Sequence, residues 1–149
     1  MMISLNEPVW DREMQKAALD ALNNEKYVLG ESVFKFEEEF AKYIGVDYAV
    51  SCSSGTMAEW LLLQAIKPKT VVVPDNTFHT VASVVRLQRR KLQLEDVNER
   101  NACMENVALN KPGKTCVIAT HLYGNLCKIK VHTEKVSLIE DCSQAAGLS

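Results

Sequence analysis

The run AVSCSSGTMAEWLLLQAI at residues 49–66 decides the fold class. It opens with β-leaning apolar residues, stops at Ser53-Ser54-Gly55-Thr56, and continues at once as an apolar pattern of helical length. A strand that turns directly into a helix is half of a β-α-β unit, from which parallel sheets are built. We therefore predict a strand at residues 48–53 and a helix at residues 56–66.

Strand and helix patterns alternate along the rest of the chain. The sequence predicts strands at residues 71–74, 91–94, 115–122 and 136–140, a helix at 77–88 and a weak helix at 101–110. Residues 11–23 and 31–44 have apolar side chains at helical spacing, and Gly45 closes the second of these helices. Near-continuous apolar strands separated by helices predict an α/β doubly wound fold, a mostly parallel sheet with helices on both faces.

The composition narrows the function classes. The chain has 149 residues, 47% of them apolar, a net charge of −2 and no linker, which favours one globular domain. The basic cluster at residues 86–91 has helical spacing and no interleaved aromatics, so a solvated face is favoured over a nucleic-acid site. With no signal peptide and no membrane-spanning run, we expect a cytoplasmic protein that binds no membrane. The five cysteines then stay reduced, and those beside apolar strands are expected to be buried.

The segment that starts the helix predicted at residues 56–66 is a candidate anion site, because parallel sheets bind ligands at the carboxyl ends of their strands. At Ser54, Gly55 and Thr56, backbone N–H groups and the helix dipole favour an anion such as phosphate. The same residues also form an ordinary Ser/Thr helix cap, and the pattern leaves both interpretations open. There is no G-x-x-x-x-G-K-[ST] motif, which argues against a nucleoside triphosphate.

Two further strand ends have candidate side chains. Phe78, in the first turn of the next helix, either faces a planar ligand or belongs to the core. His79 beside it either titrates near neutrality or is structural. Asp141, at the carboxyl end of the last strand, is unfavourable to bury without a partner. It either pairs with a cationic ring nitrogen, as in pyridoxal phosphate (PLP) enzymes, or caps the following turn.

The order of these features resembles the DegT-type (DegT/DnrJ/StrS) sugar aminotransferases, which are PLP enzymes of fold type I. The likeness rests on LNEP at residues 5–8, YVLGESVFKFEEEFAKYIG at 27–45, SGT at 54–56, Pro74 with TF at 77–78, HLYG at 121–124 and EDCSQA at 140–145. It runs through the whole chain. The resemblance implies a single domain at residues 1–149, the N-terminal portion of a truncated PLP-transferase large domain. Residues 1–46 would supply its N-terminal helices and residues 47–149 its βα units.

The resemblance also implies roles for six residues. The turn Ser54-Gly55-Thr56 matches the one that holds the PLP phosphate. Phe78 matches the aromatic that stacks on the pyridine ring, and Asp141 matches the carboxylate that keeps the ring nitrogen protonated. Gln144 matches a polar residue near the 3-hydroxyl. Family members transfer an amino group from glutamate to a nucleotide-linked keto-sugar and work as homodimers. We assign no metal ligands.

The chain departs from this family in what it lacks. Fold type I enzymes bind PLP through a Schiff-base lysine that follows the Glu-Asp…Gln-Ala motif. None of the twelve lysines of this chain matches that position. We therefore assign no catalytic residue, predict no transamination by these 149 residues alone, and expect weakened PLP binding. The alternative is a non-catalytic protein that forms oligomers or complements another chain.

Two more departures concern packing. In the family, two later strands lie between the first strand and the rest of the sheet. Without them, either the strand at residues 48–53 pairs with the last strand, or a partner covers the exposed edges. Glu59 and Trp60 occupy positions where the family usually has small apolar residues.

Overall fold

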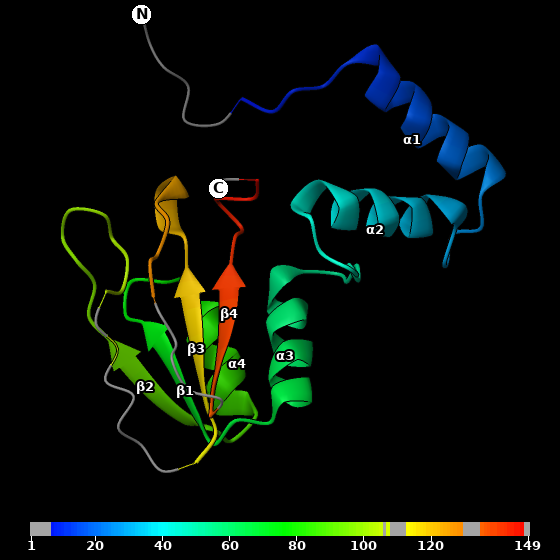
Figure 1. The fold of residues 1–149 in the computed structure, drawn as a ribbon. Coiled ribbons are helices and arrows are strands. Elements are labelled where there is room, and N and C mark those ends of the chain that lie inside the picture. Colours follow the sequence, from blue (N-terminus) through cyan, green and yellow to red (C-terminus); the bar gives the residue numbers. More distant parts are fainter. Residues whose placement is uncertain (1–6, 106, 108–112, 130–134, 148–149) are drawn as a thin grey trace, which may run out of the picture. The chain divides into compact units, whose positions relative to one another are not determined.

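The computed structural model describes residues 7–105, 107, 113–129 and 135–147 (Figure 1). The chain forms two compact units, Met1–Ser51 and Cys52–Ser149, and each is described by itself. No helix among the described residues has the length and apolar character needed to cross a membrane.

The first unit contains two helices, α1 (Arg12–Asn24) and α2 (Glu31–Ile44), both at the predicted positions. Asp11 begins α1, because its side chain accepts a backbone N–H of the first turn. Gly45 ends α2, as predicted. Its φ of 82° is the left-handed conformation that terminates helices and that glycine adopts without steric penalty.

The second unit is built on a four-stranded, all-parallel sheet with the strand order β2-β1-β3-β4. The strands are β1 (Thr70–Pro74), β2 (Lys91–Glu95), β3 (Thr115–Thr120) and β4 (Val136–Asp141). This confirms a strand in each of the four predicted segments, although β3 ends at Thr120 and not at residue 122 as predicted. The central strands β1 and β3 are buried along their whole length, and β2 and β4 are partly exposed edges. The continuous apolar sequences of β1 and β3 reflect burial on both faces.

Two helices cover one face of this sheet, α3 (Gly55–Ile66) and α4 (His79–Leu87). Leu63 of α3 and Val84 of α4 pack there against alternate strand residues, including Val73 and Ile118. Successive strand residues point to opposite faces, so the neighbouring positions form a second core on the other side. That core consists of Val72, Cys103, Met104, Val117, Ala119 and Cys127. The predicted α/β class is confirmed.

The described residues that cover the second face are not helical. Residues 101–105 form turns and bends, so the weak helix predicted at 101–110 is absent there. Of the remaining predicted positions only Val107 lies among the described residues. Short local hydrogen bonds stabilise this segment instead: Asn101 accepts the Cys103 N–H through its side chain at 3.0 Å. Asn side chains favour turns over helices for this reason.

Residues 48–53 do not form a strand, and this prediction is wrong. A strand is stabilised by hydrogen bonds to a neighbour, and no described strand pairs with this segment. Pairing with the last strand does not occur either, since β4 pairs with β3 among the described residues. Tyr48 and Val50 are 87% and 81% exposed. Ser51 instead donates its N–H and its hydroxyl to Glu37 of α2, both at 2.7 Å.

The end of α3 is held by Arg90, a member of the basic cluster at residues 86–91. Its guanidinium donates to the carbonyl of Leu63 at 2.9 Å and to that of Pro68 at 2.7 Å. The Leu63 carbonyl also accepts the Lys67 N–H at 3.0 Å, and Pro68 follows the helix, so Arg90 connects the last turn of α3 to the residues after it. Arg90 is thus a structural residue, whereas Arg86 and Arg89 are exposed, as expected for a solvated face.

Candidate functional site

A pocket of about 280 Å³ lies at the carboxyl ends of β1, β3 and β4. The chain passes from β1 to β2 on one side and adds β3 and β4 on the other, so the strand order reverses between β1 and β3. Open α/β sheets bind ligands at such a point, because the loops after the two strands diverge. The lining residues are Gly55, Thr56, Glu59, Thr77, Phe78, Thr80, Val81, Thr120, Leu122, Asp141, Ser143 and Gln144.

Most of the predicted site residues line this pocket, namely Gly55, Thr56, Phe78, Asp141 and Gln144. Ser54 is the exception. Its hydroxyl accepts the Met57 N–H at 3.3 Å, so it is the N-cap of α3 and not a lining residue. The structure therefore brings together residues from three separate stretches of the sequence, with Ser54 supporting the helix start behind them.

The start of α3 forms one end of the pocket. The N–H groups of the first helical residues, Gly55 and Thr56, have no acceptor within the helix and lie at the positive end of its dipole. A Cβ placed on Gly55 would meet no atom within 4 Å, so this side of the backbone is open to a ligand. An anionic group can approach the helix start there.

Phe78 is 65% exposed and lines the pocket, so the interpretation of Phe78 as a core residue is wrong. It precedes α4 with a φ of −61°. Its ring centroid lies 4.4 Å from that of His79, at an interplanar angle of 51°. His79 itself is exposed and is not a lining residue. The aromatic ring of Phe78 is thus available to a planar ligand.

Asp141 ends β4 and caps the next turn. Its Oδ1 accepts the Ser143 N–H at 3.1 Å and the Ser143 hydroxyl at 2.6 Å. The capping interpretation is therefore correct, and the same carboxylate also lines the pocket. Both hydrogen bonds fall on one oxygen. Among the described residues none hydrogen-bonds to Oδ2, which leaves that oxygen available to a cationic group.

Gln144 connects the turns that follow β3 and β4. Its Oε1 accepts the Tyr123 N–H at 2.6 Å, in the short helix η1 (Leu122–Gly124). Because the oxygen is engaged, the amide nitrogen is the group that can donate to a ligand. His121 supports the same edge: its Nδ1 accepts the Cys127 N–H at 2.9 Å, and its Nε2 lies 3.3 Å from a carboxylate oxygen of Glu140.

Glu59 also lines the pocket, and no role in the site was predicted for it. It lies one turn after Gly55 in α3, and its side chain is 9% exposed. Its Oε2 is buried and has no hydrogen-bond partner among the described residues. Burial, and then the charge of Asp141, raise the pKa of Glu59 to about 7. A single acidic residue within the apolar run at residues 57–63 was the available sequence signal.

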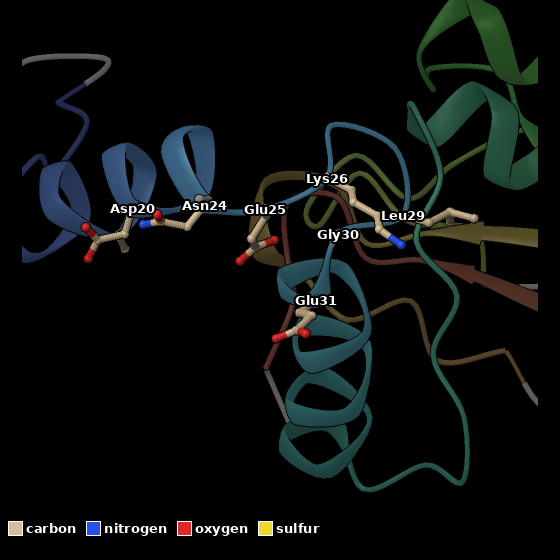
Figure 2. Close-up of a pocket in the computed structure, with 9 residues that line it drawn as sticks. Asp20, Asn24, Glu25, Lys26, Leu29, Gly30 and Glu31 are labelled. Atoms are coloured by element: carbon tan, nitrogen blue, oxygen red, sulfur yellow. The ribbon is translucent and has the colours of Figure 1, made fainter.

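A second hollow lies in the first unit, between the end of α1 and the start of α2 (Figure 2). Glu25 in this connection accepts the Ser32 N–H at 3.0 Å, and hydrogen bonding from Ser32 lowers the pKa of Glu25. A Cβ on Gly30 would lie 2.6 Å from Glu25 Oε2 and 2.8 Å from the Lys26 carbonyl oxygen. These contacts explain the hollow as a tight helix connection, and we assign no ligand to it.

The sequence matches a known family along nearly its whole length. Residues 8–149 match the DegT/DnrJ/EryC1/StrS aminotransferase family, as an N-terminal portion of it. The chain belongs to this family. The resemblance seen in the sequence is thereby confirmed.

One curated relative and two solved structures illustrate the similarity to this family. The dTDP-3-amino-3,6-dideoxy-alpha-D-galactopyranose transaminase of Aneurinibacillus thermoaerophilus is 30% identical, and the alignment covers 93% of this chain. An aminotransferase from Psychrobacter cryohalolentis has a TM-score of 0.80 at 26% identity over 94% of the chain. The E. coli GDP-4-keto-6-deoxy-D-mannose-3-dehydratase, solved with bound hydrated PLP, shares the fold with a TM-score of 0.67 at 24% identity over 80% of the chain.

These relatives are considerably longer than the chain. The alignments cover 41%, 39% and 34% of the three proteins, respectively. The chain therefore spans about two-fifths of the length of the curated relatives it matches.

Proposed function

We propose that this chain is the N-terminal portion of a PLP-dependent aminotransferase that acts on nucleotide-linked keto-sugars. The observation that supports it is the convergence of Gly55, Thr56, Phe78, Asp141 and Gln144 on one pocket at the switch point of the sheet. The dTDP-sugar transaminase among the relatives supports the substrate class, and the PLP held by the E. coli dehydratase supports the cofactor. In this proposal residues 1–46 and 47–149 belong to one domain.

The pocket residues fit the chemical groups of PLP. The open start of α3 at Gly55 and Thr56 suits the phosphate, with Ser54 fixing the helix start, and the exposed ring of Phe78 suits the planar pyridine. The available Oδ2 of Asp141 suits a protonated ring nitrogen, and the amide nitrogen of Gln144 suits the 3-oxygen. Bound PLP supplies an electron sink for bonds at the amino-bearing carbon. The residues of this chain bind and orient it.

We further propose that these 149 residues do not catalyse transamination by themselves. Among the described residues that line the pocket there is no lysine. Covalent attachment and the subsequent proton transfer depend on a lysine in such enzymes. PLP held by this pocket is therefore bound without a covalent bond, and more weakly than in a complete site.

Calorimetric titration of the full chain with pyridoxine 5′-phosphate tests the cofactor site, because this ligand has no aldehyde and reports non-covalent binding alone. We expect Asp141→Asn to weaken binding by about tenfold or more, since it removes a charged hydrogen-bond acceptor. Asp96→Asn is the matched control: Asp96 also accepts a local backbone N–H, from Val97, and does not line the pocket. Equal affinity in wild type and D141N would overturn the assignment of Asp141.

The stacking role of Phe78 has its own control. Phe78→Ala should weaken binding of the same ligand, whereas Phe34→Ala should leave it unchanged, because Phe34 is similarly exposed, at 56%, but lies in α2 outside the pocket. Equal losses in both variants would contradict a specific contact with the ring.

Reduction with borohydride in the presence of PLP tests the absence of a Schiff-base lysine. We expect no saturable, one-to-one mass gain on a defined lysine of the purified chain. Such a gain on one lysine would contradict the proposed inactivity and would make transamination worth assaying.

A second candidate function is a non-catalytic protein that forms a homodimer or complements another chain. It is favoured by the apolar side chains that α3 exposes, Met57, Leu61 and Leu62, and by the partly exposed edge strand β4. Light scattering after gel filtration separates the two candidates. A stable dimer that binds no pyridoxine 5′-phosphate supports the interaction protein, and a ligand-binding chain supports the enzyme portion. In both cases we propose a cytoplasmic location, consistent with five free thiols.

A further inference from the structure

Two carboxyl groups from different elements line the same pocket, Glu59 of α3 and Asp141 at the end of β4. Glu59 Oε2 is buried and has no hydrogen-bond partner among the described residues. Asp141 uses Oδ1 for both of its hydrogen bonds. Each group therefore presents an oxygen that the described part of the chain leaves unsatisfied. A native fold retains a buried unsatisfied oxygen such as Glu59 Oε2 where a ligand or a proton completes it.

No positively charged side chain among the described lining residues compensates the negative charge of Glu59 and Asp141. Besides these two groups, the described lining residues carry no ionisable side chain. The nearest ionisable neighbours in sequence are engaged elsewhere or exposed. Glu140 Oε1 lies 3.3 Å from His121 Nε2, and the ring of His79 packs against that of Phe78. Cys142 is an exposed thiol. Two ionised carboxylates in one partly buried pocket repel each other, and the buried one loses hydration. Below about pH 7 the favourable form of Glu59 is therefore the carboxylic acid.

We propose that Glu59 and Asp141 hold one proton between them, that together they form the position for a cationic ring nitrogen, and that binding of this nitrogen releases the shared proton to solvent. The proposal rests on the proposed cofactor site and adds Glu59 to it. The pair with one proton carries a single negative charge, which matches a single protonated nitrogen.

The release follows from the changed surroundings of Glu59. Burial is the larger cause of the raised pKa of Glu59, about 7, and it persists when a ligand binds. A cation that faces Asp141 offsets the second cause, the negative charge of Asp141, and itself favours the Glu59 carboxylate, so the pKa of Glu59 falls. Glu59 then changes from the acid to the carboxylate, and its proton passes to the buffer. Glu59 is a positioning residue in this scheme, because it acts on the ligand through Asp141 and through the net charge of the pocket.

Glu59 departs from the pattern that the family resemblance implies. The resemblance implies that the family usually has a small apolar residue at position 59, and a single carboxylate would then face the ring nitrogen. The additional acid makes cofactor affinity depend on pH in a range where a lone aspartate is fully ionised. The chain thus binds a cationic ring more tightly as the pH rises through neutrality.

Calorimetric titration with pyridoxine 5′-phosphate at about pH 7, in buffers of different ionisation enthalpy, measures the protons released. The free ligand titrates identically in every experiment, so a difference in proton release between wild type and Glu59→Gln is due to the Glu59 carboxyl. We expect wild type to release more protons than E59Q. We also expect the ratio of dissociation constants, E59Q over wild type, to rise between about pH 5.5 and pH 8.5, by about tenfold for each unit by which the ligand lowers the pKa of Glu59.

Controls separate this proposal from the proposed function. Glu99→Gln, at an exposed acid outside the pocket, should behave as wild type. Inorganic phosphate, which has no cationic nitrogen, should give no difference in proton release between wild type and E59Q. Glu59→Leu removes the same carboxyl and serves if E59Q does not fold.

Each outcome is decisive. The shared proton is overturned if the ligand binds, wild type and E59Q release equal numbers of protons, and the ratio of their dissociation constants does not change with pH. The proposed cofactor site then stands. If the ligand binds to none of the folded chains at any pH, the cofactor site fails and the proposal fails with it.

Discussion

The side-chain oxygens of Thr77 and Thr120 lie 3.0 Å apart and share a hydrogen bond. Thr77 follows β1 and Thr120 ends β3, so this bond crosses the point where the strand order reverses. Both residues also line the pocket. The bond therefore holds the two sides of the candidate site together without help from a ligand.

Replacing either threonine with valine, which has nearly the same shape, should lower the free energy of unfolding of the second unit by about 1 kcal/mol. The double variant should lose less than the sum, because both changes remove the same bond. Urea unfolding, monitored by the fluorescence of Trp60, measures these losses of unfolding free energy. Trp60 packs against the core, and a Trp10→Phe background removes the other tryptophan. Strictly additive losses would show that the bond contributes nothing.

Arg90→Met should destabilise the second unit by about 1.5–3 kcal/mol, because a charged donor to the carbonyls of Leu63 and Pro68 is lost. Arg86→Met provides the control, since Arg86 lies in the same basic cluster but is exposed. The same urea experiment compares the two variants. A similar effect at both positions would mean that the loss of positive charge, and not the contact at the end of α3, is responsible.

His121→Leu should lower the free energy of unfolding by about 1–3 kcal/mol, because the buried N–H of Cys127 loses its acceptor, Nδ1. His121→Asn retains a side-chain acceptor and should recover part of the loss. Amide hydrogen exchange at Cys127 gives a local measurement: exchange should be faster in H121L than in H121N. Equal exchange rates in the two variants would contradict the role of Nδ1.

Glu59 makes stability depend on pH in a predictable direction. The folded chain keeps the Glu59 proton up to about pH 7, whereas an unperturbed glutamate releases it near 4.5, so wild type loses stability as the pH rises between these values. Glu59→Gln has no proton to lose. Relative to wild type it should therefore gain on the order of 3 kcal/mol in unfolding free energy between about pH 5 and about pH 8. Urea unfolding at the two pH values measures this, and a constant difference would contradict a raised pKa.

The central strands could be predicted from sequence, whereas the segment at residues 48–53 could not. The runs at residues 70–74 and 115–120 are apolar throughout, and the sheet buries them on both faces. Residues 48–53 have a similar local preference for β structure, but a strand also needs a neighbouring strand to pair with. The sequence of the segment does not indicate whether that neighbour is present. No described strand meets it.

The candidate site shows the same division between local and tertiary information. The backbone turn at residues 54–56 and the strand end at Asp141 are local features, and both were found. Exposure of Phe78 and burial of Glu59 depend on how α3, α4 and the strand ends meet, so the pattern left Phe78 open and gave Glu59 no role. A lone acid in an apolar helical run is the kind of local inconsistency that accompanies functional positions.

The buried cysteines give the chain internal reporters of its own opening. Burial raises the pKa of Cys116 to about 12 and is the main cause that raises that of Cys127 to about 11. A thiol reagent attacks only a thiolate that reaches water, so both stay unreactive while the sheet is closed. Cys116 packs under α3 and α4, and Cys127 packs on the opposite face. The rates at which a reagent modifies the two thiols therefore report how often each face of the sheet opens locally, and no label or additional cysteine has to be introduced.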